Sequence, residues 1–146
     1  MKFSSLLLVA LIFSTTITKA QVNVNVYING TMSGQYTVKD GQDDAGIWYK
    51  KSVYRNATKF AIEVKGKELR KDQYKRSVEA VDDASNSLVI VKETETTLGH
   101  FDLAEKAILK RLGKGKIVKL YLQLDPASEK SKAPSKRIFI GNLTAK

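Results

Sequence analysis

The chain of 146 residues contains no cysteine. This absence excludes disulfide bonds, thiol catalysis and cysteine-ligated zinc, and it leaves no residue for a lipid anchor of the bacterial lipoprotein type. Small secreted domains often depend on disulfides for their stability. A domain of this length can instead bury roughly two thirds of its unfolded surface. We therefore expect a fold that hydrophobic packing alone stabilises.

The sequence also lacks an apolar run long enough to cross a bilayer. Its longest compact run, Leu6–Phe13, is far below the roughly 20 residues that a transmembrane helix needs. Lys2 precedes this run, and Thr18-Lys19-Ala20 follows it with the small-x-small pattern of a signal-peptidase site. We predict a signal peptide over 1–20, cleaved after Ala20, and a secreted or periplasmic protein without a transmembrane segment. Residues 21–146 are then expected to form a single domain.

Catalytic motifs are scarce. The chain has one histidine, His100, beside Phe101 and Asp102, and it contains no Gly-x-Ser-x-Gly nucleophile elbow. Asp43-Asp44 and Asp82-Asp83 are adjacent pairs, so in an extended segment their side chains point to opposite faces. Neither pair is arranged as the facing acid and nucleophile of a glycosidase. We predict that the protein is not an enzyme, and we keep one alternative in which the fold brings distant carboxylates together.

Motifs for metals and cofactors are equally few. Asp40, Gln42 and Asp44 have the alternate spacing by which loop oxygens converge on calcium. The glycine and the distal glutamate of an EF-hand are not in their places, however. Asp40–Gly46 therefore predicts an ordinary polar turn. We predict no metal site and no cofactor.

A hairpin is expected at the start of the predicted domain. Val22–Ile28 alternates apolar and polar residues with the period of a half-buried strand, and Asn29-Gly30 marks the turn. A three-residue loop would pair Val26 with Met32 and Val22 with Tyr36. We favour this register over a two-residue loop, because it places Met32, Tyr36 and Val38 on the core side.

Further strands follow along the chain. Apolar or alternating runs predict them at 47–49, 53–54, 60–64, 77–81, 88–91, 118–124 and 137–140. Leu88–Val91 is apolar on both faces, which is typical of a central strand. Residues 66–76 are mainly charged and predict a solvated connection, and Asp82–Asn86 predicts a turn.

One helix is predicted before the 118–124 strand. Asp102 is placed as its N-cap, Glu105 in the capping-box position and Gly113 after its end. The apolar stripe consists of Phe101, Ala104, Ile108 and Leu112. Seven to nine short strands with one short α-helix indicate a mainly β protein, an antiparallel β-sandwich of immunoglobulin-like architecture. An antiparallel β-barrel is the alternative.

Charge and aromatic residues suggest where a ligand binds. Residues 1–20 hold two lysines and no acid, so 21–146 keep +8 of the net charge of +10. Such a domain is attracted to polyanions, and aromatic rings beside cations can stack on sugars. The candidate ligand-binding residues are Trp48, Tyr49, Lys50, Lys51, Tyr54, Arg55, Tyr74, Lys75, Arg76, Lys136 and Arg137. The same residues fit an alternative in which the aromatics belong to the core and the lysines protect edge strands.

The predicted function is that of an exported, non-catalytic binding module. Its expected partner is an envelope or extracellular protein or an acidic polysaccharide, and export disfavours DNA or RNA. One alternative is a structural or assembly protein that acts through exposed edge strands. A third hypothesis is a carboxylate-dependent hydrolase. Asn29, Asn56 and Asn142 lie in Asn-x-Thr sequons, which are glycan acceptors in a eukaryotic secretory pathway, but chance occurrence and the turn at Asn29-Gly30 are the favoured explanation.

Overall fold

The computed structural model describes residues 21–39, 46–49, 59–66, 69 and 72–145, with the backbone alone at 46–49. Nine strands and one helix follow one another in this part of the chain. The strands are β1 (Gln21–Ile28), β2 (Thr31–Lys39), β3 (Gly46–Tyr49), β4 (Phe60–Lys65), β5 (Tyr74–Val81), β6 (Ser87–Lys92), β7 (His100–Asp102), β8 (Val118–Pro126) and β9 (Lys136–Ala145). The helix α2 (Lys106–Gly113) lies between β7 and β8. The predicted signal peptide, the strand at 53–54 and most of the polar turn at Asp40–Gly46 lie outside the described residues.

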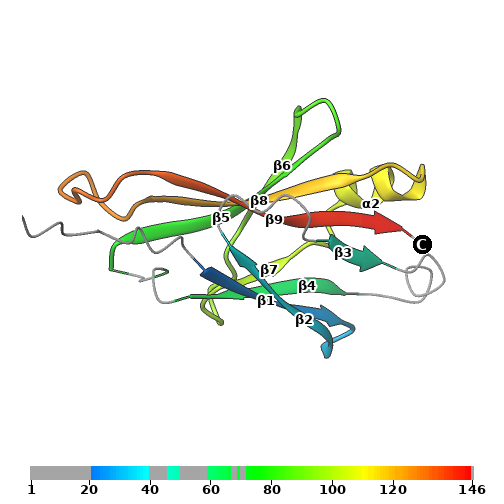
Figure 1. The fold of residues 1–146 in the computed structure, drawn as a ribbon, viewed down its shortest axis with the longest axis horizontal. Helices are drawn as coiled ribbons and strands as arrows, with labels where there is room; N and C mark the ends of the chain where they lie inside the picture. The colour runs from blue at the N-terminus through cyan, green and yellow to red at the C-terminus, as the bar shows by residue number, and fades with distance from the viewer. Residues whose placement is uncertain (1–20, 40–45, 50–58, 67–68, 70–71, 146) are drawn as a thin grey trace, which may run out of the picture.

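The strands form two separate sheets. One has four strands in the order β2-β1-β4-β7, and the other has five in the order β3-β9-β8-β5-β6. Neighbouring strands run antiparallel except β3, which runs parallel to β9. Figure 1 shows β5, β8 and β9 as an upper layer above β1, β2 and β4. The predicted mainly β sandwich with one short helix is therefore confirmed, and the barrel alternative is wrong.

The core lies between the two layers and follows from the alternation along each strand. Except in β2, which buries Val38 alone, and in β6, which buries Val91 alone, one face of each long strand supplies several apolar side chains that are almost fully buried. From the four-stranded sheet these are Val22, Val24, Val26, Phe60, Ile62, Val64 and Phe101, and from the five-stranded sheet Val78, Ala80, Leu120, Leu122, Leu124, Ile138 and Ile140. The alternate residues of the same strands face outward, which leaves an outer face on each sheet.

The turn between β1 and β2 differs from the predicted one. Ile28 pairs with Thr31, so the loop contains the two residues Asn29 and Gly30. Asn29 has φ 50° and Gly30 has φ 81°. Positive φ at both central residues twists a two-residue turn in the same sense as the flanking strands. The predicted three-residue loop is wrong.

A bulge restores the apolar pairing that the two-residue turn would otherwise lose. The register shifts between Val26 and Tyr27, and the pairs beyond the shift are Val26–Gly34, Val24–Tyr36 and Val22–Val38. Tyr36 and Val38 therefore face the core, as predicted. Met32 precedes the shift, pairs with Tyr27 and is 55% exposed, so its predicted core position is wrong.

The prediction of a central strand at Leu88–Val91 is also wrong. β6 is the last strand of the five-stranded sheet, and Ile90 is 54% exposed. The tight turn at Asp82–Asn86 returns the chain beside β5, whose other edge is already paired with β8. An apolar sequence therefore occupies an outer edge, and only Val91 is fully buried within that segment.

The helix begins later than predicted. Phe101 and Asp102 belong to β7, and Asp102 Oδ1 accepts a hydrogen bond from the Ala104 N–H before the helix starts. Glu105 is the N-cap residue and makes no side-chain capping bond, so the predicted capping box is wrong. Within α2, Ile108 and Leu112 are buried against the core, as the apolar stripe predicted. None of the helices in the described part of the chain is long and apolar enough to span a membrane.

Candidate functional site

The first candidate segment lies largely beyond the described residues. Lys50, Lys51, Tyr54 and Arg55 fall in the range 50–58, which the structure does not describe. The backbone of Trp48 and Tyr49 belongs to β3, where Trp48 pairs with Thr144 and Tyr49 with Ala145 of β9. A ligand-binding role for these residues stays a prediction.

Arg76 lies inside the sandwich. Its side chain is 2% exposed, and Nη1 donates to the Leu69 carbonyl at 2.7 Å. Nη2 donates to Glu93 Oε2 at 3.1 Å, while Nε lies 3.0 Å from Glu93 Oε1 in an ion pair whose angles do not make a hydrogen bond. Arg76 therefore stabilises the interior, and the predicted solvated connection over 66–76 is wrong where β5 begins.

Tyr74, Lys75 and Lys136 gather at one end of the five-stranded sheet. Tyr74 is 6% exposed, and the Lys136 Nζ lies 6.0 Å from the centre of its ring. Lys75 is exposed and pairs across the sheet with Asp125. The ring of Tyr74 thus belongs to the core, in line with the alternative interpretation, and the two lysines remain near the surface.

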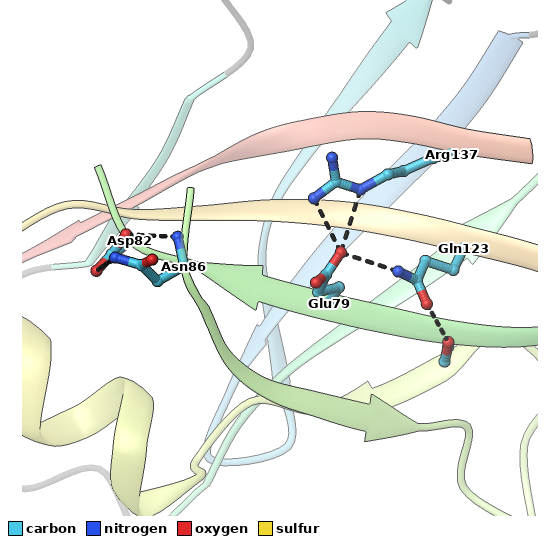
Figure 2. A network of polar contacts seen from close by, with 6 residues as sticks. Glu79, Asp82, Asn86, Gln123 and Arg137 are labelled. Carbon is cyan, nitrogen blue, oxygen red and sulfur yellow. Dashed lines mark hydrogen bonds and ion pairs between the residues drawn. The ribbon is translucent and has the colours of Figure 1, made fainter. Parts of the chain in front are cut away.

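Arg137 is engaged on the outer face of the five-stranded sheet. Its guanidinium lies 3.8 Å from the centre of the Tyr121 ring, and Nη2 donates to Glu79 Oε2 at 2.9 Å. The same Glu79 oxygen also accepts a hydrogen bond from Gln123 Nε2 at 2.8 Å. Both contacts are drawn in Figure 2. Tyr74, Lys75 and Arg76 line one hollow of about 610 Å³ beside Ile90 and Asp125, while Arg137 lies apart from them on the outer face, so the structure brings together part of the predicted set.

A different group of side chains converges on the outer face of the four-stranded sheet. Strands β1, β4 and β7 lie side by side, so two rows of three paired residues each cross this part of the sheet. Asn25 pairs with Glu63 and Glu63 with His100, while Tyr27 pairs with Ala61 and Ala61 with Asp102. Because paired residues in an antiparallel sheet point to the same side, these six residues share one face.

The small side chain of Ala61 creates a hollow in this face, which we call the Ala61 hollow. The strands of Tyr27 and Asp102 lie two strand spacings apart, so a gap of about 10 Å separates their backbones above Ala61. The hollow has a volume of about 300 Å³. Its described lining residues are Tyr27, Gly30, Lys59, Ala61, Glu63, Thr97, His100 and Asp102. This volume is at the lower end of the range for small-molecule sites.

The side chain of Glu63 is fixed in the hollow by three polar contacts. Oε2 accepts hydrogen bonds from Asn25 Nδ2 at 3.1 Å and from the Tyr27 hydroxyl at 3.0 Å. Lys65 Nζ lies 3.1 Å from the same oxygen. Among the described residues no donor lies against Oε1. Within the described part of the chain, Glu63 thus has one oxygen fixed by its neighbours and one, Oε1, that no described donor contacts.

The surroundings of Glu63 favour its charged form. Desolvation by burial acts to raise the pKa of this carboxyl, but the hydrogen bonds from Asn25, Lys65 and Tyr27 act in the opposite direction and lower the pKa overall. Glu63 is therefore a carboxylate at neutral pH, positioned to accept a hydrogen bond and not to donate a proton.

Aromatic and imidazole rings complete the walls. The centres of the Tyr27 and His100 rings lie 5.9 Å apart, with the planes tilted by 54°. His100 stands directly across from Glu63, and Asp102 holds its position through the hydrogen bond that Oδ1 accepts from Ala104. The hollow therefore combines an apolar ring face with hydrogen-bonding groups.

Sequence reasoning missed this site, although two features pointed to it. The alternation Val22–Ile28 that predicts a strand also places Asn23, Asn25 and Tyr27 together on its other face. Glu63 stands among the apolar residues of 60–64, where a carboxylate needs partners. The sequence pattern does not specify the strand order β1-β4-β7, which brings these residues beside His100.

No group of three or more acidic or histidine side chains among the described residues is arranged to hold a metal ion. Comparison of the chain with protein-family models, with curated proteins and with solved structures gives no match.

Proposed function

We propose that this chain is an exported, non-catalytic binding module whose ligand site is the Ala61 hollow. The observation that carries the proposal is the convergence of Tyr27, Glu63 and His100 around a small floor residue. These side chains stand on three adjacent paired strands, which hold them in fixed positions relative to one another. A rigid hollow with a few convergent polar groups is the common form of a ligand site.

The ionised state of Glu63 suits a binding role and leaves a hydrolase without an acid at this position. A carboxylate-dependent hydrolase needs one carboxyl group that stays protonated near neutral pH to act as the acid. The contacts of Glu63 lower its pKa and keep it ionised. A fixed carboxylate of this kind suits the orientation of a ligand by hydrogen bonding. The hydrolase hypothesis would need Asp102 or His100 to supply the acid.

Export is supported by the pattern of the first twenty residues. Lys2, the apolar run Leu6–Phe13 and the small-x-small end at Ala20 follow the order of a secretory signal peptide. The ligand would then belong to the envelope or to the extracellular medium, and the protein would be secreted or periplasmic.

A second candidate function, assembly through an edge strand, rests on β6. Its sequence is apolar, it stands at the edge of the five-stranded sheet, and Ile90 is 54% exposed. An edge of this kind can pair with a strand of another chain. The Ala61 hollow lies in the other sheet, so the two candidates can be tested by separate substitutions.

The experiment that tests the proposed site is co-sedimentation with envelope material from the source cells. Ala61→Leu fills the hollow, and Ala107→Leu makes the same change at an exposed position of α2 as a matched control. We expect the wild type and Ala107→Leu to sediment with the material and Ala61→Leu to stay in solution. Thermal unfolding of all three proteins checks that they are folded. Equal sedimentation of the three, or sedimentation of none, would refute the proposal.

A further inference from the structure

Among the described residues, the charges around the Ala61 hollow are balanced. Glu63 and Asp102 supply carboxylates, while Lys59 lines the hollow and Lys65 contacts Glu63. The chain as a whole carries +10, so this balance is local. A site for a polyanion would gather amines and exclude carboxylates, because the two signs act on the ligand in opposite directions. The arrangement favours an uncharged ligand.

Hydroxyl groups match the polar groups that remain available. Glu63 Oε1 accepts hydrogen bonds, and His100 offers two ring nitrogens for hydrogen bonding. Glu63 and His100 are a directly opposed pair, whose Cβ atoms lie about 4.5–5.5 Å apart in such a sheet. Two hydroxyl groups on neighbouring carbon atoms can therefore meet both side chains at once.

An apolar strip borders these polar groups. Tyr27 pairs with Met32, and Met32 is 55% exposed on the same outer face. A sugar ring presents a face of C–H groups and an edge of hydroxyl groups. The Tyr27 ring, with the exposed Met32 beside it, can cover the C–H face of the sugar. Glu63 and His100 can then form hydrogen bonds with the hydroxyl groups at the edge of the sugar ring.

Uncharged polar side chains continue the same face beyond the hollow. Asn25 pairs with Gln35, and Asn23 pairs with Thr37 and accepts a hydrogen bond from its hydroxyl at 2.8 Å. Asn25 is 8% exposed, and its Oδ1 has no partner among the described residues. Asn25 is itself covered, and the exposed Gln35 and Thr37 with the half-buried Asn23 form a polar row across β1 and β2 that offers contacts to a ligand longer than one ring.

We infer that the Ala61 hollow binds a neutral carbohydrate chain with vicinal hydroxyl groups, one ring lying on Tyr27 and the next rings along the amides of β1 and β2. The inference rests on the proposed function, because it specifies the ligand of that site. An acidic polysaccharide and a protein partner are the other outcomes of the test.

The test uses purified protein and envelope material that has been treated in three ways. Periodate cleaves vicinal diols, proteinase K removes proteins, and about 1 M NaCl screens charge interactions. We expect periodate to lower retention at least about tenfold, and the other two treatments to leave it unchanged. Tyr27→Ala should lower retention by about tenfold as well, or roughly 1.4 kcal/mol. Tyr121→Ala removes a tyrosine ring from the other sheet and should retain wild-type binding.

Each contrary result has a distinct meaning. Loss of retention after proteinase K, with resistance to periodate, would overturn the inference in favour of a protein partner. Loss at high salt would overturn it in favour of an acidic ligand, and resistance to both periodate and proteinase K would also refute a vicinal-diol ligand. In all three cases Ala61→Leu would still abolish binding, and the proposed function would stand. If Ala61→Leu binds like the wild type, the proposed function itself fails.

Discussion

The guanidinium of Arg76, which is buried between the two sheets, lies against the carboxylate of Glu93, with Nη2 3.1 Å from Oε2 and Nε 3.0 Å from Oε1. Glu93 Oε1 also accepts a hydrogen bond from the Gly99 N–H. The chain between β6 and β7 is thus held to the beginning of strand β5, where Arg76 lies. Because this segment carries the chain from one sheet to the other, the pair fixes how β7 arrives beside β4.

Removal of Glu93 should therefore be costly. Glu93→Ala leaves the Arg76 charge in the interior with the Leu69 carbonyl as its remaining described partner, and we expect a loss of about 3–5 kcal/mol in the free energy of unfolding. Arg76→Met with Glu93→Gln removes both charges and should recover much of this loss. Arg137→Ala, at a pair where Arg137 is 48% exposed, should cost below about 1 kcal/mol. Urea denaturation measures all three, and similar losses in Glu93→Ala and Arg137→Ala would contradict this account.

Gly99 should not tolerate a side chain. Its φ is +77°, and a Cβ atom at this position would lie 2.2 Å from the Val64 carbonyl oxygen. We expect Gly99→Ala to lower the free energy of unfolding by about 2 kcal/mol or more, because both the backbone angle and the contact are unfavourable. Gly113→Ala, at a helical glycine with no atom within 4 Å of such a Cβ, should instead stabilise by about 0.5–1 kcal/mol. Thermal denaturation compares the two, and a tolerated Gly99→Ala would refute the close approach.

The fold was predictable where the pattern is local. Alternation along Val118–Leu124 and Phe60–Val64 gave strands at the right places, and the apolar stripe gave Ile108 and Leu112 as the buried face of a helix. The errors arose where the position of a strand depends on a partner strand that is distant in sequence. Leu88–Val91 has the composition of a central strand, but its position in the sheet depends on which edge of β5 was already paired.

The candidate site shows the same limit. Arg76 has a neighbouring tyrosine and lysine in sequence, which suggested a ligand surface, yet the alternation of β5 turns it inward toward Glu93. In β4, the alternation of residues puts Glu63 on the outward face of the strand. Its role depends on Asn25, Tyr27 and His100, and sequence periodicity does not specify which strands will lie beside β4.

Acid should weaken the fold partly through Glu63. Its pKa is lower in the folded protein than the ordinary value of 4.5. The charged form is therefore favoured by folding, and its contribution is present above pH 4.5 and is lost as the pH falls through the folded pKa. We expect Glu63→Gln to be less stable than the wild type at pH 7, with the difference shrinking toward pH 3. Urea midpoints across this range measure the effect, and a constant difference at every pH would argue against it.

Tyr36 should act as a link between the sheets that alkali can break. Its hydroxyl donates to the Ile140 carbonyl at 2.6 Å, and burial raises its pKa well above the ordinary 10.0. Folding favours the neutral phenol, so this contribution is complete below pH 10 and is lost as the pH rises toward the folded pKa. Tyr36→Phe should cost about 1–2 kcal/mol at pH 7, because the Ile140 carbonyl loses its donor.

The alkaline behaviour gives an independent check on Tyr36. Absorbance at the tyrosinate band should rise in two stages, with one tyrosine ionising only as the protein unfolds, and this late stage should disappear in Tyr36→Phe. If all tyrosines of the wild type ionise together while the protein stays folded, the buried hydrogen bond to Ile140 is not maintained in solution.

Self-association should depend on the exposed edge of β6. Ile90 is 54% exposed on this edge strand, and Lys is a residue that commonly prevents pairing between edges. If the edge recruits a second chain, Ile90→Lys should shift the protein to a smaller species in sedimentation velocity at high concentration, while its unfolding free energy changes by less than about 0.5 kcal/mol. Leu98→Lys provides the control, since Leu98 is 52% exposed but lies outside the strands. An Ile90→Lys protein that sediments like the wild type would argue against the proposed assembly function.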